Sequence, residues 1–529
     1  MNFEVKIKNN SRINTFSDQY SELKCIGHVW EKELLSSLCT KDLEFKYAVG
    51  VIKNITGFFS LVYQNEKQLI ASVDHIRSHP IFYGQTNTTF YLSDCAEWVR
   101  EMVKDISMDE QAKAEFQLTG YVTGSDTLYK NVKQLQAGEC LSLVNGKLEL
   151  SRYYRFLHIE PAQYNEQELL LNLDKVAKES IKRLIKYANG KQIVVPLSGG
   201  YDSRLIATLL KETGYENILT FTYGVKGNKE AEYSKKVADA LGLKWMFIEY
   251  TNELWSDSWH TAERKAYQVF GSGWSSIPHI QDWLAVKIMK QQGMVEPNAI
   301  FVPGHTGDFI SGGHIPKHLF NDFNAKYNIK DVFEAIYSKH YSLVNNHSMI
   351  EGKNNFFKKV LNGMEVNTVE TAYEFADTFE KWEWQERQSK FIFNSVRVYE
   401  FFGYDWWIPL WDKEFVQFFE RLPLKLRSHD WYKEYVRYKY LSNTSEDLSN
   451  ELGNTSEEFL SRRIASLKII EALHLKEVLS KIYKKIFKPR SHLSIETRFD
   501  KEETYKLTEQ GYSSNGKDAY FFLQENSNV

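Results

Sequence analysis

Residues 193–210 read IVVPLSGGYDSRLIATLL, which joins a strand, a turn and the start of a helix. The apolar run 193–197 is typical of a buried strand, and the apolar spacing after Ser203 is typical of a helix. Between them, Ser198, Gly199 and Gly200 form a turn that lets an anion approach the backbone at a helix N-terminus. Ligands of open α/β sheets bind at this position, beyond the carboxyl ends of the strands. The stretch therefore predicts a phosphate-binding loop.

This loop differs from the Walker loop because it lacks the Gly-Lys-Ser/Thr ending. It carries Asp202 instead, and a carboxylate repels phosphate unless a cation lies between them. We therefore expect Mg²⁺ at Asp202, with a nucleotide as its partner. An ordinary strand-to-helix turn, with Asp202 and Ser203 capping the helix, is the alternative interpretation.

Strands and helices alternate around this loop. Further strands are predicted at 218–223, 244–250 and 299–302, and helices at 203–213 and 229–241. A long helix precedes them and stops at Asn189 and Gly190. This alternation predicts a parallel sheet wound with helices, and the chain beyond Trp255 reads as mostly helical.

The first 155 residues or so have a different pattern. Runs rich in β-forming residues occur at 56–64, 68–74, 88–94 and 139–156, with one helix predicted around 108–117. Asn145 and Gly146 signal a hairpin turn. We therefore expect an α+β domain of antiparallel sheet at 1–158 and an α/β domain with a largely helical C-terminal part at 165–529.

Composition narrows the function classes. The chain has 529 residues, with 66 basic and 69 acidic side chains and a net charge of −3, which gives no overall field for nucleic acid. Its four cysteines lack the spacing of a zinc site or a disulfide framework. The N-terminus is polar and no long apolar run occurs, so we expect no signal peptide, no membrane span and a cytoplasmic location.

The motif SGGYDS at 198–203 resembles the pyrophosphate-binding loop of the N-type ATP pyrophosphatases. Within that group the chain resembles asparagine synthetase and its relatives, including β-lactam synthetase. The segments FTYG (221–224), VPGHTGDFISGGH (302–314) and YDWWIPLWD (404–412) follow in the family's order. The resemblance implies an Ntn-hydrolase-like first domain and a five-stranded parallel sheet of the adenine nucleotide α-hydrolase type. It also implies an amide ligase that uses ATP and Mg²⁺, forms an acyl-adenylate and releases pyrophosphate.

The same resemblance implies site residues. Those expected to contact ATP are Leu197, Ser198, Gly199, Gly200, Asp202, Ser203, Thr222, Tyr223, Pro303 and Gly304. Asp202 and Asp308 are expected to hold Mg²⁺. The stretch 270–283 falls where the family's acceptor pocket lies, so Ser272, Trp274, Ser275 and His279 are expected to contact the substrate, with Trp274 stacking on a sugar ring. Plain loop-and-helix packing is the alternative for this stretch.

The first half resembles the family's glutamine-hydrolysing domain, whose nucleophile is an N-terminal cysteine that its own amine activates. Here Asn2 follows Met1, and Cys25 and Cys39 lie inside the chain. We therefore expect a scaffold without glutaminase activity. Free ammonia or an amine on a substrate is then the expected nitrogen donor.

Two further departures concern the chemistry. His305 stands where asparagine synthetase has Glu and β-lactam synthetase has Tyr, and counting back from Pro409 places that Tyr's acidic partner at Asp405. We expect a dyad of His305 and Asp405 that deprotonates the attacking amine; a loop-capping His beside a surface Asp is the alternative. The family's late lysine has no clear counterpart. The candidates are Arg462, Arg463, Lys468 and the basic run 481–490, which also reads as an ordinary basic helix face.

No motif in the sequence identifies the substrate acid. The PGHTGDF sequence within the segment 302–314 resembles that of asparagine-synthetase-like proteins from bacterial surface-polysaccharide gene clusters. This resemblance suggests that the substrate is a uronic or sugar acid. A lasso-peptide or other macrolactam cyclase and a β-lactam-synthetase-like enzyme are alternatives. A tRNA-modifying ATPase with this loop and a non-catalytic scaffold are further alternatives. A homodimer is a further expectation.

Overall fold

The computed structural model describes residues 2–8, 12–345, 350–444 and 498–527. A five-stranded sheet, entirely parallel, carries the SGGYDS loop. Its strands lie in the order β13 (Lys244–Glu249), β12 (Ile218–Gly224), β11 (Ile193–Pro196), β14 (Ile300–Phe301) and β15 (Asp405–Trp406). β11 is the central strand of this sheet, and its residues Ile193, Val194 and Val195 are buried. Strands of a parallel sheet are covered on both faces, which explains the continuous hydrophobic run of β11.

The predicted elements around β11 are confirmed. α5 (Glu166–Ala188) ends at Asn189, whose left-handed φ of 47° closes the helix, and it packs against α6 (Tyr201–Glu212). α7 (Lys229–Leu241) connects β12 to β13. The two residues of β15 are too few to give a periodic pattern, so this strand was not predicted.

The rest of the second domain is largely helical, as expected. Its helices are α8 (Asn252–Trp259), α9 (Ala262–Ser272), α10 (Trp283–Gln291), α11 (Gly307–Ile310), α12 (Ile329–His340), α13 (Ile350–Met364), α14 (Ala372–Glu383), α15 (Arg397–Phe401), α16 (Lys413–Glu420), α17 (Asp430–Asn443), α22 (Lys501–Glu509) and α23 (Ser514–Asn526). A π-helix, η4 (Trp384–Ile392), and a 3-10 turn, η5 (Phe393–Val396), join α14 to α15. Other 3-10 turns are η2 (Lys317–Phe320), η6 (Pro409–Trp411) and η7 (Leu424–Leu426).

Two sheets form the N-terminal domain. The larger has the order β10 (Lys147–Arg152), β9 (Glu139–Val144), β5 (Gln68–Val73), β4 (Gly57–Asn65), β3 (Ser21–Val29) and β2 (Ile13–Ser17), and it is antiparallel throughout. The smaller has the order β1 (Asn2–Lys6), β7 (Thr89–Ser93), β6 (Phe82–Gln85) and β8 (Lys133–Gln134). Asn145 and Gly146 turn the β9–β10 hairpin with positive φ angles, which confirms the predicted turn.

The structure corrects two details of this domain. β1 pairs with β7 in parallel, so the domain is not purely antiparallel. Four helices occur where one was predicted: α1 (Lys32–Ser36), α2 (Phe45–Lys53), α3 (Ala96–Val103) and α4 (Glu110–Thr119). α1 to α3 are at most nine residues long, and so short a run gives little helical periodicity.

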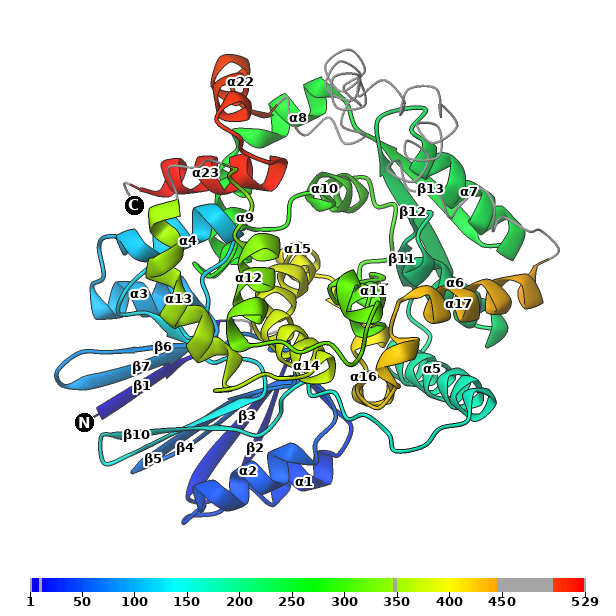
Figure 1. Cartoon of the computed structure of the whole chain (residues 1–529). Coiled ribbons are helices and arrows are strands. Elements are labelled where there is room, and N and C mark those ends of the chain that lie inside the picture. Colours follow the sequence, from blue (N-terminus) through cyan, green and yellow to red (C-terminus); the bar gives the residue numbers. More distant parts are fainter. Residues whose placement is uncertain (1, 9–11, 346–349, 445–497, 528–529) are drawn as a thin grey trace.

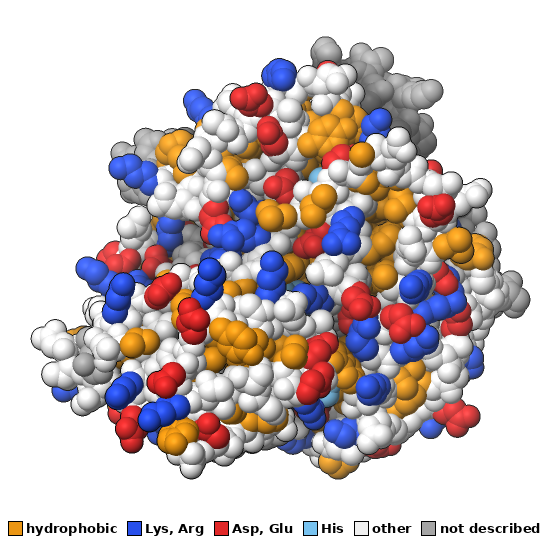
Figure 2. Space-filling view, turned by 90° about the horizontal axis from the view of Figure 1, so that it is seen from below, with side chains coloured by type: hydrophobic (Ala, Val, Ile, Leu, Met, Phe, Trp, Pro, Cys, Tyr) orange, Lys and Arg blue, Asp and Glu red, His pale blue; other side chains and the backbone are white. Residues whose placement is uncertain are grey.

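The two domains pack closely. In Figure 1 the N-terminal sheets lie at the lower left and the parallel sheet at the right, with α11, α14 and α15 between them. On the face shown in Figure 2, Lys and Arg side chains alternate with Asp and Glu and form no large area of one sign. No helix within the described residues is long and apolar enough to cross a membrane.

Candidate active site

The SGGYDS loop lies between the end of β11 and the first turn of α6. Ser198 accepts a hydrogen bond from the Gly200 N–H at 3.1 Å, and its own N–H donates to the Ser203 hydroxyl at 3.2 Å. The hydroxyls of Ser198 and Ser203 lie 3.1 Å apart. The free N–H groups and dipole of the 12-residue helix α6 therefore face a turn lined by small hydroxyl side chains. Such a turn can hold a phosphate or pyrophosphate group.

A second loop, which follows β14, packs directly on the first. A Cβ atom on Gly304 would lie 2.6 Å from the backbone nitrogen of Ser203, and one on Gly307 would lie 2.1 Å from Oδ1 of Asp202. Only glycine fits at these two positions. Since β11 and β14 are parallel neighbours, the two loops meet at the carboxyl edge of the sheet.

This contact brings two carboxylates together. Asp202 accepts hydrogen bonds from the backbone N–H groups of Gly307 and Asp308, and the Tyr432 hydroxyl donates to its Oδ1 at 3.0 Å. Burial, and next the charge of Asp308, raise the pKa of Asp202 to about 7. A cation between these two oxygen ligands would relieve their repulsion.

The donor set suits Mg²⁺. Mg²⁺ usually takes one or two protein carboxylates and completes its shell with water and substrate phosphates. Asp202 and Asp308 provide that number beside the phosphate-binding loop. In the described part of the chain, no group of three or more His, Cys, Asp or Glu side chains is arranged so that it could hold a metal ion.

His314 fixes the second carboxylate. Its Nε2 lies 3.0 Å from Oδ2 of Asp308, and its Nδ1 bonds to the buried Glu383, which also pairs with Lys339 at 3.0 Å. Burial opposes protonation of His314, but Glu383 and Asp308 raise its pKa to about 9. Burial of Asp308 raises its pKa, but the hydrogen bond and charge of this imidazolium, together with the Phe309 N–H and the charge of His429, lower the pKa of Asp308 to about 2. His314 was missed as a site residue, although it ends the quoted segment VPGHTGDFISGGH.

The expected nucleotide-contacting residues gather at the same sheet edge. Leu197 and Pro303 follow β11 and β14, and Thr222 and Tyr223 lie at the end of β12. The Thr222 hydroxyl donates to the Leu197 carbonyl, which joins the two strand ends. The Tyr223 ring stacks on Tyr250 with centroids 5.2 Å apart. Their ATP contacts remain predictions that rest on this common placement.

Comparisons with known proteins identify the family of the chain. The family model for asparagine synthase matches residues 177–442, which is half of the chain. The chain belongs to the asparagine synthase family. A model described as a glutamine amidotransferase domain matches residues 20–154. Both matches agree with the resemblance inferred from the sequence.

Individual relatives of this asparagine synthase family member are distant. It is 25% identical over 202 residues to a candidate glutamine-hydrolysing asparagine synthetase 2 of Methanocaldococcus jannaschii, covering 37% of this chain and 39% of that protein. It is 28% identical over 157 residues to the tRNA-specific 2-thiouridylase MnmA 2 of Fusobacterium nucleatum, covering 29% and 42%. The chain thus spans about two fifths of the length of these relatives. An NH3-dependent NAD synthetase structure from Campylobacter jejuni matches 38% of this chain and 84% of its own, at 14% identity and a TM-score of 0.21.

The structure does not join His305 to Asp405. Asp405 pairs with Arg12 at 2.8 Å and with Lys191 at 3.5 Å. It lies beside Ile300, at the start of β14, whereas His305 lies beyond the end of that strand. The expected dyad is therefore corrected: β15 runs parallel to β14, and its first residue, Asp405, pairs with Arg12 and Lys191 instead of His305.

His305 has other neighbours. Nε2 of His305 lies 2.7 Å from the Ser395 hydroxyl, and its ring centroid lies 6.4 Å from that of His279. Nε2 of His279 lies 2.8 Å from Oδ1 of Asp282, which is 4% exposed and also accepts from the Tyr399 hydroxyl at 2.7 Å. Burial, followed by the charge of His279, lowers the pKa of His305 to about 4, so His305 is neutral.

The expected substrate contacts of Ser272, Trp274 and Ser275 are also corrected. All three side chains are fully buried. The Trp274 indole N–H donates to Glu97 of the N-terminal domain at 2.8 Å, and the serine hydroxyls bond to nearby carbonyls. The Trp274 side chain thus links the two domains, and of the four predicted contacts His279 alone lies near His305. The candidate replacements for the family's lysine (Arg462, Arg463, Lys468 and 481–490) lie outside the described residues.

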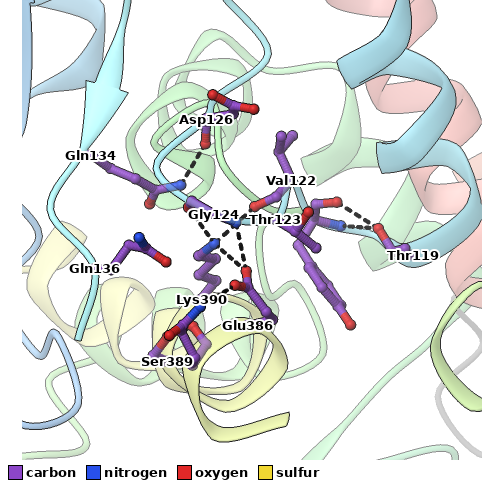
Figure 3. Close-up of polar contacts among 12 residues, drawn as sticks. Thr119, Val122, Thr123, Gly124, Asp126, Gln134, Gln136, Glu386, Ser389 and Lys390 are labelled. Carbon is purple, nitrogen blue, oxygen red and sulfur yellow. Dashed lines mark hydrogen bonds and ion pairs between the residues drawn. The ribbon is translucent and has the colours of Figure 1, made fainter. Parts of the chain in front are cut away.

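A buried polar cluster fixes η4 against the N-terminal domain (Figure 3). The Lys390 ammonium donates to the carbonyls of Val122 at 3.1 Å and Gly124 at 2.7 Å, and it pairs with Glu386. Glu386 also accepts from the Gly124 N–H at 2.9 Å. Both charges are fully buried, and removal of either partner would leave the other uncompensated. The cluster thereby anchors the segment that leads to Ser395, the hydrogen-bond partner of His305.

Proposed function

We propose that this protein is an AMP-forming carbon–nitrogen ligase that joins a substrate carboxylate to ammonia or an amine at the expense of ATP. The observation that carries this proposal is the contact between the SGGYDS loop and the loop after β14. It places two carboxylates beside a helix N-terminus that has no Walker lysine. Such a site is suited to hold pyrophosphate as a leaving group.

The first step joins the substrate to AMP. A carboxylate oxygen attacks the α-phosphorus of ATP, the bond to the β-phosphate breaks, and pyrophosphate leaves. The N–H groups at the start of α6, with the hydroxyls of Ser198 and Ser203, would hold the leaving phosphates. Mg²⁺ held by Asp202 and Asp308 would neutralise the charge that develops on the pyrophosphate.

The second step forms the amide. The nitrogen attacks the acyl carbon, AMP leaves, and the nitrogen loses a proton. Only a neutral amine attacks, so a base is needed at neutral pH. We assign this role to His279, because its Nε2 lies 2.8 Å from the Asp282 carboxylate and its ring lies next to that of His305. His305, kept neutral by burial and held by Ser395, would position the acyl group or the amine.

The nitrogen reaches this site from solvent in our proposal, not through the N-terminal domain. Phe58 of that domain packs against Phe393, Trp406 and Trp407, with ring centroids 4.8–6.1 Å apart, and all four rings are buried. Close packing of this kind leaves little room for passage of ammonia. Burial also raises the pKa of the Cys25 thiol to about 12, which makes it a poor nucleophile.

The substrate class is proposed from the sequence of the second loop, and a uronic or sugar acid is the first candidate. The test is a panel of uronic acids, nucleotide-sugar acids and amino acids, incubated with ATP, Mg²⁺ and ammonium. Pyrophosphate release that requires both the acid and Mg²⁺ is expected, and Asp202→Asn or Asp308→Asn should abolish it. Release of inorganic phosphate in its place would contradict the proposal.

A further inference from the structure

A cavity of about 650 Å³ lies between the N-terminal domain and the helices α9 and α15. Its size is in the range of small-molecule sites. Its basic and imidazole side chains are Lys8, Arg77, His79 and Arg397, and its aromatic side chains are Phe82, Phe270 and Phe401. The wall also carries the carboxylates Asp94, Glu97 and Glu400, so its preference for an anion depends on which of its cations lack a partner.

Arg77 is the unusual member of this wall. Its side chain is 1% exposed, and its guanidinium makes one hydrogen bond, from Nη1 to the Ser389 carbonyl at 3.3 Å; Ser389 lies beside Lys390 in Figure 3. Nε and Nη2 have no hydrogen-bond partner and are closed off from solvent, so an anion in the cavity would reach them only after a side chain of the wall moves. Burial, followed by the charge of Arg397, lowers the pKa of Arg77 to about 9. A buried guanidinium without a counter-ion is strongly unfavourable, so a missing partner is indicated.

The carboxylates of the cavity wall do not supply that partner. Glu97 is occupied by Arg100, which donates to it from Nε at 2.9 Å and from Nη2 at 2.7 Å. Glu400 pairs with Arg12 at 3.0 Å and with Arg397 at 2.5 Å. Both acids are therefore already neutralised by other arginines, and the third carboxylate of the wall, Asp94, accepts a hydrogen bond from the Lys8 N–H at 2.8 Å.

The unpartnered edge of Arg77 has the shape that receives two oxygens. Nε and Nη2 form the side edge of the guanidinium, and the same edge binds carboxylates elsewhere in this protein. Arg183 holds Asp412 through Nε at 2.6 Å and Nη2 at 2.7 Å, and Arg100 holds Glu97 in the same way. A carboxylate or phosphate is thus the matching group.

We propose that this cavity binds a small organic anion, a carboxylate or phosphate ester with an apolar body, whose charged end pairs with Arg77. The apolar body would lie against Phe270 and Phe401, of which Phe270 is 43% exposed. The site is separate from the ligase site. Asn394, Arg397 and Phe401 line the cavity, whereas Ser395 points from a different face of the same helical segment toward His305.

The test uses the full chain and 8-anilinonaphthalene-1-sulfonate (ANS), an anion with an aromatic body whose fluorescence reports binding. We expect one ANS per chain with a Kd below about 100 µM. Arg77→Met should weaken it at least about tenfold. Lys8→Glu reverses an exposed charge at the cavity and should also weaken binding without disturbing the core, whereas the matched control Lys67→Glu, on the β4–β5 hairpin, should not.

Alkylation of Cys95, which lines the cavity, tests whether ANS binds there. Bound ANS should slow alkylation of Cys95 by iodoacetamide several-fold and leave Cys39, the other half-buried cysteine, unaffected. Competition by benzoate or by phenyl phosphate then identifies the preferred anion. The proposal is overturned if ANS shows no saturable binding, if Lys8→Glu and Lys67→Glu bind it equally, or if both cysteines respond alike.

Discussion

Replacement of Asp202 by Asn should stabilise the unliganded protein at pH 8, even though it removes a site residue. The Asp202 carboxyl has a pKa of about 7 in the folded protein and an ordinary value of 3.8. Between pH 3.8 and 7 the folded chain therefore holds a proton that the unfolded chain releases, so stability falls as pH rises through this window. The loss is about 1.4 kcal/mol per pH unit and at most about 4 kcal/mol above pH 7.

Asn keeps an oxygen for the Tyr432 hydroxyl but weakens the hydrogen bonds from Gly307 and Asp308, at a cost of about 1 kcal/mol. The net advantage of Asp202→Asn should thus be about 2–3 kcal/mol at pH 8 and close to zero at pH 5. The assay is thermal unfolding at both pH values, with Asp257→Asn, an exposed acid on α8, as the control. Mg²⁺ and ATP together should raise the melting temperature of the wild type and not of the variant.

The test is how the stability difference between Asp202→Asn and the wild type depends on pH. If Asp202→Asn changes stability by the same amount at pH 5 and pH 8, or lowers it more at pH 8, the ionised Asp202 is not destabilised by burial and by Asp308. The carboxylate pair would then not explain the proposed demand for Mg²⁺.

Three further predictions concern the base, a buried ion pair and the loop contact. His279→Asn should slow amide formation about 100-fold or more and leave ATP–pyrophosphate exchange nearly intact; equal loss in both assays would remove His279 as the base. Arg427 and Glu380 form a bidentate pair, both contacts at 2.7 Å and both side chains fully buried, so Arg427→Met should cost about 3–5 kcal/mol in chemical denaturation. Gly307→Ala should abolish ATP binding measured by calorimetry, whereas Gly50→Ala, whose Cβ would meet no atom within 4 Å, should have no effect.

The sequence predicted those parts of the fold that depend on local pattern. The run 193–210 determined β11, the loop and α6, because apolar periodicity and a glycine turn are both encoded within 18 residues. β15 and the parallel pairing of β1 with β7 escaped prediction, since each depends on distant partners. Pairing between segments leaves no periodic signal in either one.

In the site, too, local motifs predicted residues correctly, whereas contacts between distant segments were missed. Asp202 and Asp308 were predicted from their motifs, and the structure brings them together. The dyad of His305 and Asp405 was wrong because counting along the chain ignores the direction in which β15 enters the sheet. His314 contacts Glu383 and Asp282 contacts Tyr399, and both partners are buried and distant in the sequence. A single sequence does not show such contacts.

The central claim is that ATP is cleaved between its α- and β-phosphates for use in amide formation. The most direct measurement is phosphorus NMR of the purified protein with ATP, Mg²⁺, ammonium and the acid panel. AMP and pyrophosphate should form in equal amounts, only with an acid present, and their formation should be lost in Asp308→Asn. Formation of ADP and inorganic phosphate would contradict it.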